Sequence, residues 1–263
     1  MTADVDRADP AEAPFEYGRG FLSWRVCEEI LEGRTYPALP FVDDVRVVVD
    51  AGANVGATSV YFAQRHPDAT IHAVEPARES LESLVRNTSR LPNVVVHPVG
   101  LAARDGVATL HHGRDDSGSS SIHRAEWHDG TEETITLRAA GAWAAENGID
   151  RIDVLKVDVE GCEYEVLHSL RHLLPTVKVV YVEYGQRELR RSIVRLLDPT
   201  HDLYFGLTTL DQGECIYLRR DLADHPDARP FILQIVAANQ APPPTRRFPT
   251  HPRGGAPAKR PID

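Results

Sequence analysis

The stretch VVVDAGANVG, residues 47–56, places an acid at the end of an apolar run and directly before a glycine-rich turn. A strand, a glycine turn and a helix in this order are typical of nucleotide-binding sheets. Dinucleotide sites need a glycine in the middle of the turn to admit a pyrophosphate, but here Asn54 stands between Gly52 and Gly56. Asp50 would repel a diphosphate, whereas its carboxylate suits the ammonium and sulfonium groups of S-adenosylmethionine. The stretch therefore favours S-adenosylmethionine over NAD.

A second acid, Glu75, ends the next predicted strand at residues 70–76. A carboxylate at this position can accept hydrogen bonds from the two hydroxyls of a ribose. It would do so for NAD as well as for S-adenosylmethionine, so it does not decide between the two cofactors. A plain strand-to-helix turn without a ligand is the remaining interpretation of residues 50–56.

Short apolar strands alternate with amphipathic helices along most of the chain, which predicts a mostly parallel, doubly wound α/β sheet. The stretches 106–113 and 133–139 instead alternate like half-exposed strands, so we expect an antiparallel insertion there. The serine-rich loop between them, 114–124, should cover the cofactor or substrate. A seven-stranded sheet is expected from strands at 46–50, 70–76, 93–102, 152–161 and 177–185 and an antiparallel pair at 202–207 and 214–219. Helices are expected at 21–33, 56–67, 77–91, 141–149, 162–174 and 187–197.

The chain has 263 residues and a formal net charge of −10. No basic stripe with interleaved aromatic residues occurs, so a nucleic-acid partner is not expected. No apolar run approaches the ~18 residues of a membrane span, and the N-terminus lacks the layout of a signal peptide. Cys27, Cys162 and Cys215 lie far apart and form neither a disulfide framework nor a metal-binding pair. We therefore expect a cytoplasmic protein that has no membrane partner.

Three segments are expected from the composition. Residues 1–20 read as a flexible polar arm and 21–240 as one folded domain. The proline-rich tail at 241–263 cannot bury enough apolar surface to offset its ordering entropy, so we expect it to be disordered. In and before the first helix, Tyr17, Phe21 and Trp24 could supply a stacking wall for a sugar, a homodimer contact or ordinary packing.

Five stretches, taken together and in order, resemble the FkbM-like methyltransferases, which are S-adenosylmethionine-dependent O-methyltransferases of bacterial natural-product and carbohydrate pathways. The resemblance covers about residues 45–185, and LKVDVEGCEYEVL is its most specific part. The stretches are VVVDAGANVG (47–56), AVEP (73–76), SGSSS (117–121), IDVLKVDVEGCEYEVL (152–167) and VVYVEYG (179–185).

The resemblance implies a Rossmann-like class I methyltransferase fold and a set of cofactor-binding positions. The chain departs from the family at RAAGAW (138–143), where an acid often begins the helix. A role for an acid is therefore not expected at that point. The cofactor-binding positions implied are Asp50, Gly52, Asn54, Gly56, Glu75, Gly100 and Leu101.

Methyl transfer to an aliphatic hydroxyl needs a base or a metal to help remove the proton. Asp158 and Glu160 follow one core strand and Glu183 ends the next, so all three should reach the same sheet edge. Asp158 and Glu183 could hold Mg²⁺, by analogy with other class I O-methyltransferases. Alternatively, Asp158 or Glu160 is the general base, or these acids are structural. His123, in the serine-rich loop, could also act as a base or be a solvated loop residue.

The acceptor expected from the resemblance is a hydroxyl of a sugar or oligosaccharide, for instance a mannose unit of a methylated polysaccharide. A polyketide-type hydroxyl is the second choice. An NAD-dependent oxidoreductase is a rival from another enzyme class, which Asp50 and Asn54 disfavour. The third hypothesis is a non-catalytic S-adenosylmethionine-binding module that recruits a partner through its proline-rich tail.

Overall fold

The computed structural model describes residues 15–18, 20–113, 120–123 and 128–240, so the predicted tail and most of the predicted arm lie outside it. Its main sheet is built from β1 (Val47–Ala51), β2 (Thr70–Val74), β3 (Val94–His97), β7 (Val154–Val157), β8 (Val179–Tyr184), β9 (His201–Thr208) and β10 (Gly213–Arg219). The strand order is β3-β2-β1-β7-β8-β10-β9. The pairs from β3 to β8 are parallel, and β10 runs antiparallel to both of its neighbours. The predicted seven-stranded, mostly parallel sheet and its antiparallel closing pair are confirmed.

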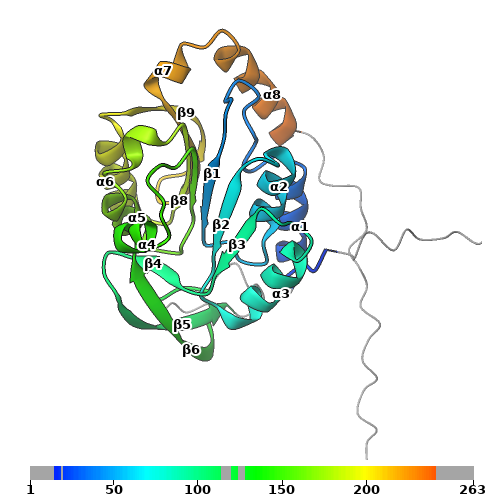
Figure 1. The fold of residues 1–263 in the computed structure, drawn as a ribbon, viewed down its shortest axis with the longest axis vertical. Coiled ribbons are helices and arrows are strands. Elements are labelled where there is room, and N and C mark those ends of the chain that lie inside the picture. Colours follow the sequence, from blue (N-terminus) through cyan, green and yellow to red (C-terminus); the bar gives the residue numbers. More distant parts are fainter. Residues whose placement is uncertain (1–14, 19, 114–119, 124–127, 241–263) are drawn as a thin grey trace, which may run out of the picture.

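Helices cover both faces of this sheet (Figure 1). One face carries α1 (Gly20–Leu31), α2 (Ala57–Arg65) and α3 (Arg78–Thr88), and the other carries α4 (Ala140–Glu146), α5 (Glu163–Ser169) and α6 (Arg187–Leu197). The 3₁₀ turn η2 (Leu174–Thr176) follows α5, and the last helices are α7 (Arg220–Ala223) and α8 (Ala228–Gln240). No helix in the described part of the chain is long and apolar enough to cross a bilayer.

Alternating side chains of the central strands feed two separate cores, as a parallel sheet with two covered faces requires. Val49 and Leu155 belong to the core beneath α4, α5 and α6. Val48 and Val154 belong to the core beneath α1, α2 and α8. Every second residue of β1 and β7 therefore points toward the face covered by α1 and α2. Polar side chains at these alternate positions can meet on that face.

The predicted single strand at 93–102 is wrong, because the chain turns at Pro98. Val99 donates a backbone hydrogen bond to the carbonyl of His97 across this turn, and proline has no N–H to offer a strand partner. After the turn, β4 (Gly100–Ala102) joins a second sheet with β5 (Gly106–Gly113) and β6 (His128–Ala139), in the order β4-β6-β5. β5 and β6 are antiparallel, as predicted for the insertion.

A buried acid, Asp153, fixes the beginnings of β1 and β7. Its carboxylate accepts hydrogen bonds from the backbone N–H groups of Arg46 (2.8 Å) and Val47 (3.0 Å). It also forms ion pairs with Arg151 (2.5 Å) and Lys178 (3.3 Å). Burial alone would raise the pKa of Asp153, but these donors outweigh it and lower the pKa below its ordinary value. At this end of the sheet, the buried charge is fully matched by donors.

Candidate functional site

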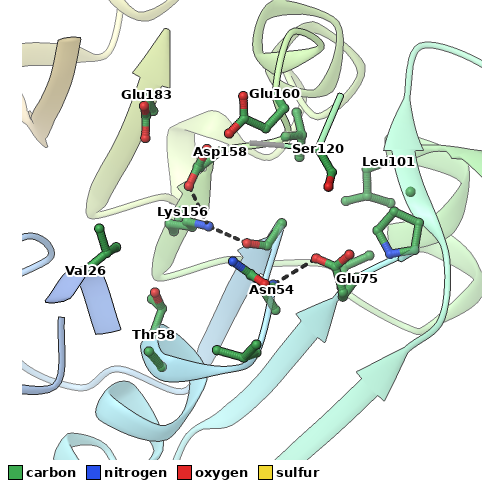
Figure 2. Close-up of a pocket in the computed structure, with 18 of the residues that line it drawn as sticks. Val26, Asn54, Thr58, Glu75, Leu101, Ser120, Lys156, Asp158, Glu160 and Glu183 are labelled. Carbon is green, nitrogen blue, oxygen red and sulfur yellow. Dashed lines mark hydrogen bonds and ion pairs between the residues drawn. The ribbon is translucent and has the colours of Figure 1, made fainter. Parts of the chain in front are cut away.

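A pocket with a volume of about 320 Å³ opens at the carboxyl ends of the central strands. The chain order reverses between the neighbouring strands β1 and β7, and doubly wound sheets bind ligands at such switch points. Figure 2 shows Leu101 and Glu75 at one end of the pocket, Glu183 and Val26 at the other, and Lys156 between them. The volume is in the range of small-molecule sites, which begins at about 300 Å³.

A buried lysine, Lys156, forms the floor of the pocket between two acids. The register of β1 and β7 places Asp50 directly beside Lys156, and the ammonium lies 3.5 Å from the Asp50 carboxylate and 3.3 Å from that of Asp158. It also donates to the carbonyl of Gly52 at 2.6 Å. Burial acts to lower the pKa of Lys156, but Asp158 and Asp50 overcome that effect and raise it. Lys156 is therefore held in its cationic form near neutral pH.

Asp50 is fully buried and is not one of the described residues that line the pocket. Ser59, in α2, donates a hydrogen bond of 2.6 Å to one of its oxygens, and Lys156 faces the other. The sequence predicts that the Asp50 carboxylate stabilises the positive groups of S-adenosylmethionine. The structure instead places it one layer behind the pocket, where it holds Lys156.

The glycines of the first turn are required mainly by packing against the protein itself. Gly52 has φ +80°, and a Cβ there would lie 1.8 Å from the Asp158 carbonyl oxygen. Gly56 has φ +92°, and its Cβ would lie 2.6 Å from the Leu84 side chain of α3. Gly52 lines the pocket, whereas Gly56 faces α3 and does not. The turn thus brings the ends of β1 and β7 together and starts α2 at the pocket edge.

Glu75 is held rigidly at the end of β2. Its two oxygens accept backbone hydrogen bonds from Asn54 and Ala77, each 2.8 Å long. Asn54 is itself fixed by a hydrogen bond from Ser80 to its side-chain oxygen (2.9 Å). Burial raises the pKa of Glu75 to about 7, although the two N–H donors act to lower it. A carboxylate so placed has lone pairs left for a ligand's hydroxyl groups.

The wall beside Glu75 is an apolar slot built by the second sheet. Gly100 and Leu101, which the family resemblance implies as cofactor-binding positions at the end of the third strand, belong instead to β4 and line this slot. A Cβ at Gly100 would lie 2.8 Å from the Leu137 side chain, so the glycine allows β4 to approach β6 closely. This slot suits a flat apolar ring. Its remaining apolar lining is Val74, Pro76, Val99, Leu110, Ile122, Ile135 and Leu137.

Asp158 lies in the middle of the pocket wall and is partly exposed, with 24% of its side-chain area accessible. Besides Lys156, it contacts the hydroxyl of Tyr36 at 3.4 Å. The Tyr36 ring lies 5.7 Å from the Lys156 ammonium and packs edge-on against Tyr181. Burial, and then Asp158, raise the pKa of Tyr36, so this phenol stays protonated and can donate to Asp158. Two donors therefore orient one carboxylate oxygen of Asp158.

Glu183 and Glu214 form a second acidic feature at the far end of the pocket. They are directly opposite partners in the antiparallel pair of β8 and β10, so both side chains lie on the same face. The charge of Asp158, then burial, raise the pKa of Glu183 to about 9. Burial and Asp158 raise the pKa of Glu214 to about 7. These two carboxyl groups therefore carry less negative charge near neutral pH than ordinary glutamates.

Glu160, in the turn after β7, reaches the pocket. His123, at the end of the serine-rich segment, does not. Glu160 lines the pocket and has a left-handed φ of +57°. Ser121 donates a hydrogen bond of 2.6 Å to the Glu160 carbonyl, which docks the end of the serine-rich segment on this turn. His123 is exposed and its ring packs over Gly161, away from the described pocket lining. Ser120 and Ile122 line the pocket, and residues 114–119 of the predicted covering loop lie outside the described residues.

The lining chemistry fits S-adenosylmethionine and does not fit a diphosphate or a divalent ion. Lys156 is the single basic side chain among the described lining residues, against six acids. A diphosphate would lack cationic partners there. For Mg²⁺, the predicted pair was Asp158 and Glu183, but Asp158 is already paired with Lys156, and the described residues contain no cluster of three metal-ligating side chains. The acids are Glu29, Glu75, Asp158, Glu160, Glu183 and Glu214.

Several lining residues were not predicted from the sequence. Lys156 is a charged residue within the apolar strand β7, for which an acid partner could be expected, but the choice of Asp50 depends on the register of two strands far apart in the chain. Tyr36 and the α1 side chains Val26 and Ile30 carry no motif. Trp24 of α1 is buried and does not belong to the described lining, so ordinary packing describes it best.

The chain is similar in sequence to known methyltransferases. Residues 50–229 match the family model described as the methyltransferase FkbM domain. Methyltransferase sdnD of Sordaria araneosa is 32% identical over 195 residues, which cover 62% of this chain and 73% of that protein. The 2-O-methyltransferase NoeI of Sinorhizobium fredii is 27% identical over 158 residues, covering 54% and 65%. Hexuronic acid methyltransferase AglP of Haloferax volcanii is 27% identical over 178 residues, covering 66% and 70%. The matches thus span about two thirds of the relatives' lengths, and slightly less for NoeI.

Proposed function

Because the chain belongs to the FkbM methyltransferase family, whose domain model matches residues 50–229, we propose that it transfers a methyl group from S-adenosylmethionine to a hydroxyl of a sugar or short oligosaccharide. The observation that carries this proposal is the division of one pocket into two chemically different ends. One end combines Glu75 with an apolar slot, and the other end presents Asp158, oriented by Lys156 and Tyr36.

The first end would hold the cofactor. Glu75 would accept hydrogen bonds from the ribose hydroxyls, and the slot at Gly100 and Leu101 would take the adenine ring. The N-terminus of α2, where Ala57 and Thr58 line the pocket, would face the carboxylate of the methionine part. The bound cofactor supplies an electrophilic methyl group on a positively charged sulfur, which the acid-rich lining stabilises.

At the second end, Asp158 would align the acceptor hydroxyl and receive its proton. The new O–C bond forms as the S–C bond breaks, and the electron pair of the broken bond stays on sulfur. Because the reaction is an in-line displacement, most of the rate gain comes from alignment of the two reactants. Lys156 and Tyr36 hold the Asp158 carboxylate in place for this task. Glu160, which also lines the pocket, is the second candidate for the base.

The choice of a sugar as acceptor is supported by the named relatives and by the lining. One relative is named a hexuronic acid methyltransferase, and another a 2-O-methyltransferase. Carboxylates at the acceptor end offer several hydrogen-bond acceptors, which a molecule with neighbouring hydroxyls can use together. A mannose unit of a polysaccharide is one acceptor of this kind.

Calorimetric titration and a product screen test the proposal. S-adenosylhomocysteine should bind the full chain, and NAD should not; binding of NAD alone would point to a different enzyme class. Incubation with S-adenosylmethionine and a panel of glycosides should give products heavier by one methyl group in mass spectrometry. The same assay repeated with a strong chelator should give unchanged rates, whereas loss of activity that Mg²⁺ restores would return Asp158 and Glu183 to a metal-binding role.

A further inference from the structure

The acceptor end of the pocket has an unusual charge balance. Glu183 and Glu214 are side by side on β8 and β10, and within the described part of the chain neither carboxyl has a hydrogen-bond or ion-pair partner. Among the described lining residues Lys156 is the one cation, and it is already shared by Asp50 and Asp158. An additional negative charge at this end would therefore have no cationic partner among the described lining residues that is not already paired.

Helix α1 contributes an apolar side chain to the acceptor end of the pocket. Val26, on α1, lines the pocket and keeps 41% of its surface exposed. Figure 2 shows it at the same end of the pocket as Glu183. A ring with an apolar face and hydroxyl edges could contact Val26 on one side and the carboxyl groups on the other. A sugar has both features.

From this geometry we infer that the acceptor carries no negative charge within the pocket, and that the Glu183–Glu214 pair is the element that rejects an acidic sugar. The inference rests on the proposed function and narrows its substrate class to uncharged hydroxyl-bearing rings. A carboxylate of the acceptor would lie near the charge of Asp158 and beside the partly ionised Glu214, and like-charge contacts of this kind are a common means of excluding wrong partners.

The titration of the pair supports the inference. Asp158 and burial raise the pKa of Glu183 to about 9, so this site already resists the charge of its own carboxyl group. The carboxylate of a bound uronate would meet the same desolvation and the same repulsion from Asp158. A neutral ring would meet neither cost, and protonated Glu183 could donate a hydrogen bond to one of its hydroxyls.

The test compares methyl α-mannopyranoside with methyl α-mannopyranosiduronate, two rings that differ in a hydroxymethyl against a carboxylate group. Binding to the full chain with S-adenosylhomocysteine is followed by saturation-transfer NMR, and methyl transfer by mass spectrometry. The neutral glycoside should bind and react at least roughly tenfold better than the uronate. In the double variant Glu183→Gln/Glu214→Gln, binding and methylation of the uronate should increase, and the preference for the neutral glycoside should largely disappear.

The matched control is Glu82→Gln/Glu188→Gln, which makes the same two glutamate-to-glutamine changes at exposed helix positions of α3 and α6. It should keep the wild-type preference. Equal or better use of the uronate by the wild-type chain would overturn the inference and leave the proposed function intact. Failure of S-adenosylhomocysteine to bind would instead overturn the proposed function. Binding of that nucleoside without binding of either glycoside would reject the sugar acceptor, and the inference with it.

Discussion

The two ends of strand β7 hold two aspartates in opposite situations. At its beginning, the buried Asp153 has two backbone donors and two basic side chains for a single carboxylate. At its end, Asp158 and Asp50 share a single lysine, and Glu183 lies close enough for Asp158 to raise its pKa. One end is saturated with donors and the other is short of them.

The difference separates an element that stabilises the fold from one that is prepared for a ligand. Matched donors lower the pKa of Asp153, so ionisation of this group favours the folded state. A shortage of donors raises the pKa of Glu183 and Glu214, so ionisation of these groups disfavours it. Perturbed carboxyl groups in a cavity are typical of functional sites. The same strand therefore carries a stabilising acid at one end and a candidate catalytic acid at the other.

The largest effect is expected from Asp158→Asn. Loss of a general base typically lowers the turnover number by about 10²- to 10⁴-fold, and the amide keeps the shape of the side chain. Calorimetry should show nearly unchanged binding of S-adenosylhomocysteine, because the cofactor end lies at Glu75 and Leu101. Glu160→Gln serves as the comparison. If Glu160→Gln is inactive and Asp158→Asn is active, Glu160 and not Asp158 is the general base.

The edge of the sheet at which these acids meet could be predicted from the sequence, because parallel strands end on the same side. Asp158, Glu160, Glu183 and Glu75 were placed there correctly by the strand pattern alone. The position of Asp50 behind the pocket was not predicted. It depends on Lys156 lying beside it, and strand neighbours far apart in the chain are not visible in local periodicity.

Two further differences between expectation and structure have identifiable physical causes, one local and one tertiary. The predicted strand at 93–102 contains Pro98, which argues against one continuous strand. Proline has no backbone N–H group, so it cannot pair fully with strands on both sides. Glu214 and Tyr36 carry no motif, and they reach the pocket only because β10 is inserted beside β8 and the chain after α1 folds over the strand ends. Tertiary packing, and not the local sequence pattern, therefore places these two residues at the pocket.

The second prediction concerns the saturated end. Asp153→Ala leaves two N–H groups and two cations without their acceptor, so the free energy of unfolding should fall by about 3 kcal/mol or more. Because the folded pKa of Asp153 lies below its ordinary value of 3.8, its contribution is present above that pH and is lost as the pH falls below it. Urea denaturation at pH 7 and at pH 3 measures this. Asp150→Ala, at an exposed position nearby, should cost little at either pH.

The smallest effect, and the one with the sharpest pH signature, is expected from Glu183→Gln. In the wild-type chain, the pKa of this group rises from 4.5 to about 9 on folding. Folding therefore takes up a proton between these values, and the stability contributed by Glu183 is lost as the pH rises through that window. Glutamine cannot ionise, so the variant should melt at a temperature close to that of the wild type at pH 5 and a few degrees higher at pH 8. Glu188→Gln, an exposed glutamate on α6, should shift neither melting temperature. A variant that is no more stable than the wild type at pH 8 would mean that Glu183 has a cationic partner in solution, and the contrast between the two ends of the sheet would then disappear.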